Sequence, residues 1–161
     1  MKVASLYLNT QTTNGKYVPV DKTNLANVKW SINWREIFGE YDTTDKLCRV
    51  KAKLVSSGST TLSSANNQGS VRISITSQYS NITNGLNLGP LILRQTPDSL
   101  ITYYMDLDTI QTFGLSANIP MSNDFFVQIV KNDDKTLQSS VPEYQLWLYF
   151  DIDEDNDYEK F

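Results

Sequence analysis

The chain has 161 residues, of which 40% are hydrophobic and 20% charged, and this length and composition are typical of one globular domain. It contains no histidine and one cysteine, which excludes histidine-dependent nucleophiles and bases, the commonest zinc ligand and an intrachain disulfide. A formal net charge of −4 argues against a nucleic-acid binder, which needs a basic surface.

These exclusions leave little room for an enzyme. Carboxylate chemistry is the one catalytic class still open, and no pair of acidic residues can be placed across a cleft from the sequence. We therefore expect no catalytic residue, no metal and no cofactor. The opening residues MKVASLYLNT contain no long apolar run, so we expect no membrane insertion and folding in a reducing cytoplasm.

Alternation of apolar and polar residues with period two recurs along the chain and predicts β-strands, because successive side chains of a strand point to opposite faces. In chain order, the expected strands are residues 2–9, 27–34, 47–56, 70–77, 90–95, 101–108, 125–131 and 144–151. The third alternates most regularly, and it places Cys48 as an inert thiol on a buried face. The fifth is a nearly continuous apolar run, typical of a strand covered on both sides.

Segments rich in Ser, Thr, Asn, Gly and Asp separate these strands and predict loops. The expected loops are residues 10–26, 58–69, 78–89 and 132–142. Helix is scarce, with single turns expected at Asn33–Phe38 and from Asp108 to Thr112. Eight short strands with long polar connections predict an all-β, antiparallel jelly-roll sandwich over residues 1–152, and an immunoglobulin-like sandwich is the alternative.

The outward side of one sheet can be assembled from strand parity. In a jelly roll the first, eighth, third and sixth strands share a sheet, so the basic side chains of the third strand should face Asp106, Asp108 and Asp151. Aromatic residues of the eighth strand point outward beside them, and Trp and Tyr are enriched in interface cores. The predicted interface residues are Tyr7, Arg49, Lys51, Lys53, Trp147 and Tyr149.

Three explanations of the outward Trp147 and Tyr149 stay open: a subunit contact, packing under a loop or tail, and a platform for stacking a sugar. Residues 153–161 form an acidic tail in which Asp153, Asp155 and Asp157 alternate. Counted from Asp151, this alternation resembles the start of a calcium-binding loop, but Asn156 stands at the sixth position, where such a loop needs glycine. A solvated tail that docks on a basic partner is the favoured interpretation.

The segment VKWSINWREIF at residues 28–38, with Tyr41 and the strand LCRVKAKLVS at residues 47–56, is similar to the opening of a known group of proteins. It resembles the small jelly-roll capsid proteins, minor or penton, of large double-stranded DNA viruses of protists and of their virophage and polinton-like relatives. The resemblance implies a virion component that is made in the host cytoplasm. Its implied partners are copies of itself, as in a pentamer, and the major capsid protein.

Two functional hypotheses follow. The first is a structural capsid protein, penton or minor component, that assembles through its sheet surface. The alternative is a carbohydrate-binding β-sandwich that uses exposed Trp and Tyr as stacking platforms.

Overall fold

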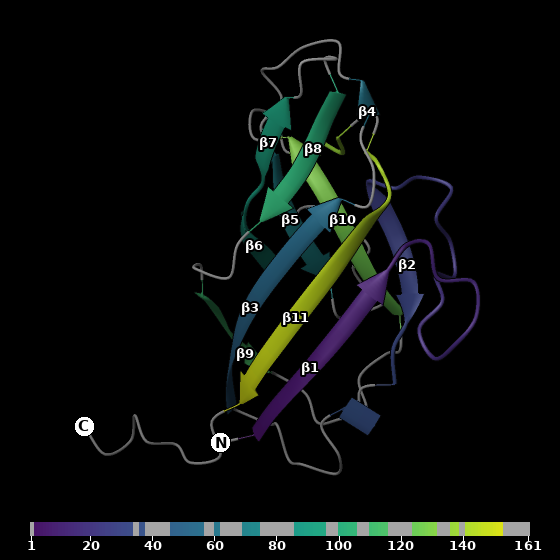
Figure 1. The fold of residues 1–161 in the computed structure, drawn as a ribbon. Helices are drawn as coiled ribbons and strands as arrows, with labels where there is room; N and C mark the ends of the chain where they lie inside the picture. The colour runs from purple at the N-terminus through teal and green to yellow at the C-terminus, as the bar shows by residue number, and fades with distance from the viewer. Residues whose placement is uncertain are drawn as a thin grey trace.

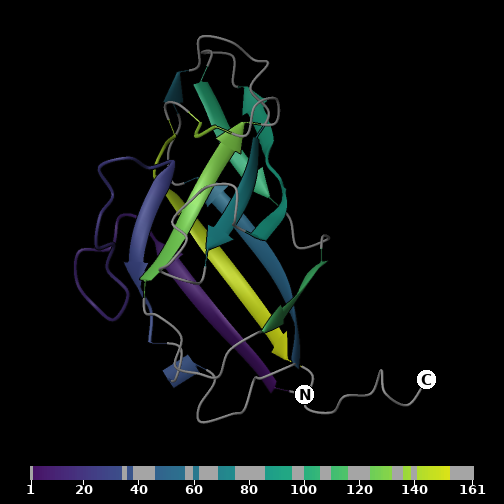
Figure 2. The same cartoon turned by 180° about the vertical axis from the view of Figure 1, so that it is seen from behind.

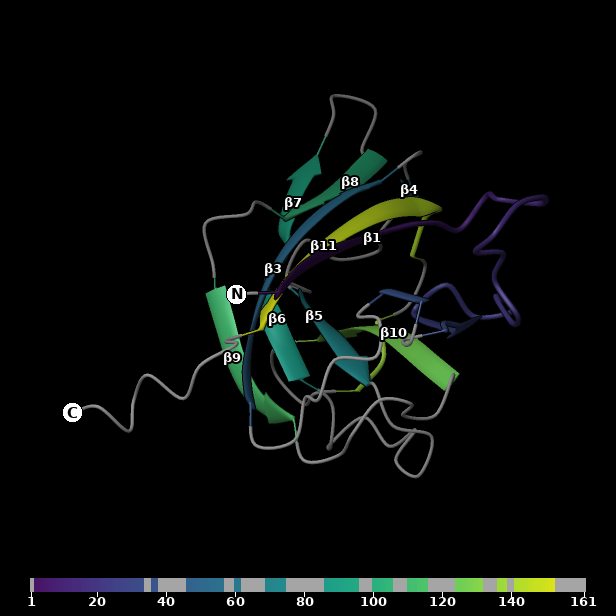
Figure 3. The same cartoon turned by 90° about the horizontal axis from the view of Figure 1, so that it is seen from below.

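The structure is a computed structural model. It describes residues 2–33, 36–37, 46–56, 60–61, 69–74, 86–95, 100–105, 110–115, 124–131, 136–138 and 141–152. These residues form eleven strands in two antiparallel sheets. Figure 3 shows the sheets as two layers, one above the other.

The seven-stranded sheet lies in front in Figure 1. It holds, in spatial order, β1 (Lys2–Asn9), β11 (Tyr144–Ile152), β3 (Lys46–Ser56), β8 (Leu100–Met105) and β4 (Thr60–Thr61), with β7 (Ile92–Gln95) paired to β8 and β9 (Ile110–Leu115) paired to β3. The four-stranded sheet is nearest the viewer in Figure 2. Its order is β2 (Asn27–Ser31), β10 (Asp124–Lys131), β5 (Gly69–Ser74) and β6 (Leu86–Pro90).

One parity of each long strand fills the space between the sheets. The side chains of Leu6 and Leu8 in β1, for example, are at most 2% exposed, while Ser5 and Tyr7, which alternate with them, are exposed. The largest side chains in this core are Trp30, Phe125, Tyr144 and Phe150. Because the core-facing residues alternate so strictly, the register of the strands also fixes which residues point outward.

The expectation of an all-β protein with two antiparallel sheets is confirmed. The expected neighbourhood of the first, eighth, third and sixth strands is also confirmed, since β1, β11, β3 and β8 lie in that order. The turn expected at Asn33–Phe38 is present in its described part, where Glu36 and Ile37 are helical and the Glu36 N–H donates to the Asn33 carbonyl at 3.1 Å.

The predicted number of strands was too small, partly because residues 90–95 are not one strand. The chain leaves the four-stranded sheet at Pro90 and enters the seven-stranded sheet at Ile92, with Leu91 buried between them. Gly89, which precedes the break, has a φ of 133°, a conformation that residues with a side chain rarely adopt. A continuous apolar run has no period, so the sequence pattern gave no sign that the run changes sheet.

The turn predicted from Asp108 to Thr112 was wrong, because β9 begins at Ile110. This strand pairs with residues 46–51 of β3, whereas β8 pairs with Leu54 and Val55 farther along the same edge. Strand β3 therefore has two different neighbours in succession on one side. As a result Lys51 lies opposite Ile110 in register, while Asp106 and Asp108, which were expected to face the cations of this strand, lie outside the described residues.

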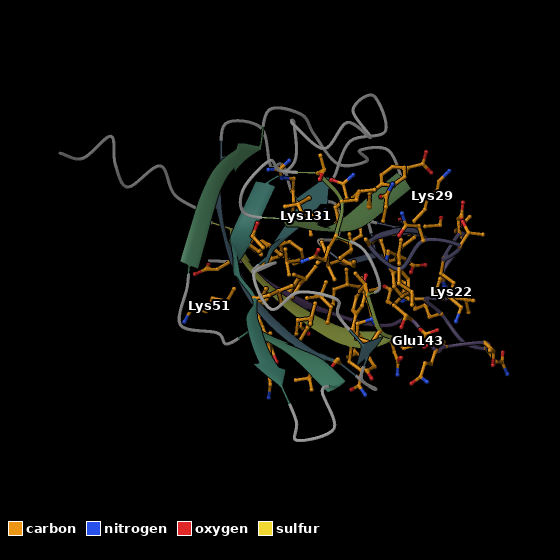
Figure 4. All side chains as sticks on the ribbon, turned by 90° about the horizontal axis from the view of Figure 1, so that it is seen from above. Lys22, Lys29, Lys51, Lys131 and Glu143 are labelled. Atoms are coloured by element: carbon orange, nitrogen blue, oxygen red, sulfur yellow. The ribbon has the colours of Figure 1, made fainter. Side chains whose placement is uncertain are left out.

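The connection from β1 to β2 is tied to the start of β11. Thr10 is fully buried; its hydroxyl donates to the carbonyl of Tyr144 at 3.2 Å and accepts the Tyr144 N–H at 3.0 Å. Lys22 donates to the Thr10 carbonyl at 2.9 Å and forms an ion pair with Glu143 at 3.2 Å, and Figure 4 shows Lys22 and Glu143 on the same side of the molecule. These bonds hold the two chain-distant segments together.

Candidate functional site

The outer surface of the seven-stranded sheet carries the residues that parity had singled out. Antiparallel pairing of β1 with β11 and of β11 with β3 places Tyr7, Trp147 and Lys53 in one row across the three strands. Ser5, Tyr149 and Lys51 form the next row. We call the surface made by Tyr7, Trp147, Tyr149, Lys51 and Lys53 the aromatic–basic face.

The first row is held by contacts between its members. The ring centroids of Tyr7 and Trp147 are 5.1 Å apart with the planes inclined by 42°, and the Lys53 Nζ lies 5.5 Å from the Trp147 ring centroid. An aromatic pair of this kind contributes about 0.5–1.5 kcal/mol beyond the burial of its area. An exposed cation over an aromatic ring contributes about 0.5–1 kcal/mol.

Polar side chains fix the orientation of Tyr7. Its hydroxyl donates to Gln145 Oε1 at 3.2 Å and accepts the Asn9 Nδ2–H at 3.3 Å. The ring is therefore positioned before any partner arrives, which reduces the loss of side-chain entropy on binding. The bond from Asn9 lies within β1, whereas the bond to Gln145 depends on the pairing of β1 with β11, which no local pattern shows.

All three residues of the second row, Ser5, Tyr149 and Lys51, are exposed, whereas in the first row Trp147 and Lys53 are half-buried. Tyr149 is 39% exposed and Tyr7, in the first row, is 44% exposed, and both are among the most exposed large hydrophobic side chains of the described residues. Lys51 is also exposed. Two open tyrosine rings beside a packed tryptophan and two lysines combine the apolar centre and the charged margin that protein interfaces have.

The outer surface of the four-stranded sheet is different. Its central residues Ser70, Arg72, Gln128 and Val130 are between 0% and 8% exposed, although they point away from the core of the sandwich. Of the two outer surfaces, as far as the described residues show them, the aromatic–basic face is thus the one with open side chains at its centre. Figure 4 shows Lys51 and Lys29 on opposite sides of the molecule.

Five of the six predicted interface residues come together on this face. The sixth, Arg49, lies in β3 opposite Asp151, as predicted, and its side chain lies outside the described part of the structure. The predicted acidic residues Asp106, Asp108, Asp153, Asp155 and Asp157 also lie outside the described residues, as does the side chain of Cys48.

The described residues offer no competing chemical site. They contain no group of three or more His, Cys, Asp or Glu side chains that could hold a metal ion. Within the same part of the chain, no helix has the length and apolar character needed to cross a membrane. Neither the comparison with protein-family models nor the comparison with curated proteins finds a match to this chain.

Proposed function

We propose that this chain is a structural protein that assembles through its aromatic–basic face, and that it is a jelly-roll component of a virus capsid, in a penton or minor capsid position. The observation that carries the assembly proposal is the open row of aromatic and basic side chains on three paired strands. Tyrosine and tryptophan dominate the energy of many interfaces, and here they stand on rigid strands with the Tyr7 ring already oriented.

The jelly-roll assignment is supported by the order of strands. The first and last strands pair with each other, and β3 and β8 follow them in the same sheet, while β2, β10, β5 and β6 form the second sheet. This alternation of successive long strands between two sheets is the pattern of a double Greek key, and it favours the jelly roll over the immunoglobulin-like sandwich.

The capsid assignment rests on the resemblance of residues 28–38 and 47–56 to small capsid proteins. It implies that the partners are other copies of this chain and the major capsid protein, and that the protein resides in the virion. Purification of intact virus particles tests it directly: the chain should remain with the particles through a density gradient. Its complete loss into the soluble fraction would contradict the capsid role while leaving assembly through the face to be judged separately.

Assembly is tested by sedimentation velocity of the purified chain over a range of concentrations. We expect an oligomer for the wild type and a dissociation constant at least about 30-fold higher for Tyr149→Ala, the loss typical of a hot-spot residue. The matched control is Val20→Ala, which shortens another exposed side chain, 57% exposed and in the β1–β2 connection. A wild type that stays monomeric, or equal effects of the two substitutions, would contradict the proposal.

Binding of a carbohydrate is the second candidate, favoured by the two open rings of Tyr7 and Tyr149. Trp147 is less suited to stack a sugar, because Tyr7 and Lys53 already contact its ring. A glycan array probed with the monomeric chain, with and without a chelator, separates the candidates. If the chain binds a glycan and Tyr149→Ala abolishes that binding, the role of this face is carbohydrate binding and not assembly.

A further inference from the structure

The net charge of the chain is concentrated in one segment. Residues 153–161 contain five of the 18 acidic residues and one of the 14 basic residues, so this segment carries the formal charge of −4 and residues 1–152 are neutral in sum. The segment follows directly on β11, the central strand of the aromatic–basic face. A strongly acidic segment and a face that carries two lysines therefore belong to the same chain.

Among the described residues, no carboxylate lies opposite the two lysines of the face. Lys51 lies between Tyr149 and Ile110, and Lys53 lies beside Trp147. Arg49, two residues earlier in β3, has Asp151 as its partner in register. An acidic partner laid on the face would therefore meet Lys51 and Lys53 without displacing a carboxylate of the described strand residues.

The spacing of the two sets of charges is the same. Arg49, Lys51 and Lys53 occupy alternate positions of a strand, about 6.7 Å apart. Asp153, Asp155, Asp157 and Glu159 also occupy alternate positions, so in an extended conformation they would repeat at the same interval on one side of the chain. An extended acidic segment laid along β3 would then bring one carboxylate to each of the three cations and leave one carboxylate over.

We propose that residues 153–161 of one copy dock in extended form along β3 on the aromatic–basic face of a second copy. This inference rests on the proposed assembly through that face and names the segment that occupies it. The partner is a second copy of this chain, recognised by alternating carboxylates that meet alternating cations beside open tyrosine rings.

The geometry favours docking on a second copy over docking on the face of the same chain. To return to its own β3, the chain would have to reverse direction after Ile152 and travel back to the level of Trp147, five residues along β11 and about 17 Å away. A reversal consumes about three residues, which would use Asp153 and Asp155 in the turn. On a second copy all four alternating carboxylates remain available for the cations.

A mixing experiment tests the exchange. The donor variant carries Lys51→Glu and Lys53→Glu and keeps its tail; the acceptor variant carries Asp155→Asn and Asp157→Asn and keeps its face. Each variant alone should associate about tenfold more weakly than the wild type, whereas the mixture should form a one-to-one complex seen by sedimentation, because one intact tail meets one intact face. A mixture that associates no better than its components would overturn the proposal, since docking within one chain cannot be complemented.

Two charge-matched controls sharpen the result. Lys29→Glu with Lys131→Glu makes the same charge change in the four-stranded sheet, away from the face, and should leave association unchanged. Asn156→Asp with Asp157→Asn keeps composition and charge but shortens the run of alternate acidic positions, so it should weaken association about threefold or more. Wild-type association of this second control would refute the matched spacing.

The outcome also separates this inference from the assembly proposal on which it rests. If the acceptor variant assembles like the wild type while Tyr149→Ala does not, the face is an interface and the acidic segment is not its occupant. If the wild type itself stays monomeric, both proposals fall.

Discussion

Tyr144, the first residue of β11, provides a quantitative test of how the core is closed. Its side chain is 1% exposed, and in the part of the chain that the structure describes its hydroxyl has no hydrogen-bond partner. Burial raises the pKa of this hydroxyl well above its ordinary value, and the neighbouring Glu143 carboxylate raises it further. The folded protein should therefore keep Tyr144 protonated at a pH where the unfolded chain ionises it.

The sign of the pH dependence follows from this raised pKa. Stabilisation is complete below the unfolded-state pKa of about 10 and is lost as the pH rises above it, because only the unfolded state releases the proton. One such group lowers the free energy of unfolding by about 1.4 kcal/mol at pH 11 relative to neutral pH. Tyr144→Phe removes this loss, and because it also removes a buried unpaired hydroxyl it should raise the free energy of unfolding at pH 7 by about 1 kcal/mol.

Urea unfolding of the wild type and Tyr144→Phe at pH 7 and pH 11 measures both effects. Tyr149→Phe, at an exposed position of the same strand, is the control for the loss of one tyrosine hydroxyl. The gap between wild type and Tyr144→Phe should widen by about 1.4 kcal/mol from pH 7 to pH 11. An unchanged gap would show that solvent or a polar partner reaches the hydroxyl in the folded state, and the reasoning would be wrong.

Three further predictions concern residues that hold the sheets and the face in place. A double-mutant cycle of Tyr7→Ala and Trp147→Ala, measured by urea unfolding, should give a coupling energy of about 0.5–1.5 kcal/mol between the two side chains. A coupling energy near zero would show that the contact between the two rings does not stabilise the fold. Thr10→Val should lower the free energy of unfolding by about 1–3 kcal/mol, because it leaves the buried Tyr144 N–H of β11 without its acceptor, whereas Thr10→Ser should retain most of the stability. Gly69→Ala should lower the melting temperature, because a Cβ there would lie 2.7 Å from the Val130 carbonyl oxygen; an unchanged melting temperature would mean that this backbone can move apart without cost.

The extent of sequence-based prediction differed between local and long-range features. Strand β1 was predicted with its observed bounds, and β10 and β11 within one residue at each end, because strict alternation is a local property that the core imposes on every strand. The outward orientation of Tyr7, Lys51, Lys53, Trp147 and Tyr149 followed from the same parity.

What sequence reasoning missed depended on contacts between distant segments. The break at Leu91 and the strand at Ile110 are set by which sheet is available to pair, and neither has its own periodic signature. The hydrogen bond from Tyr7 to Gln145 joins β1 to β11, and the burial on the outer side of β5 could not be inferred from the polar residues Ser70 and Arg72.

The pairing of β1 with β11 makes the aromatic–basic face a product of the two halves of the sequence. Lys2 lies opposite Ile152 and Asn9 opposite Gln145, so the two strands are far apart in the chain: Tyr7 and its partner Gln145 are 138 residues apart. Closing so long a loop is slow and comes late in folding. A growing chain therefore cannot display this face until β11 has been made, and a chain cut short before β11 cannot display it at all. Any assembly through the face would admit only molecules in which β11 has been made and has paired with β1.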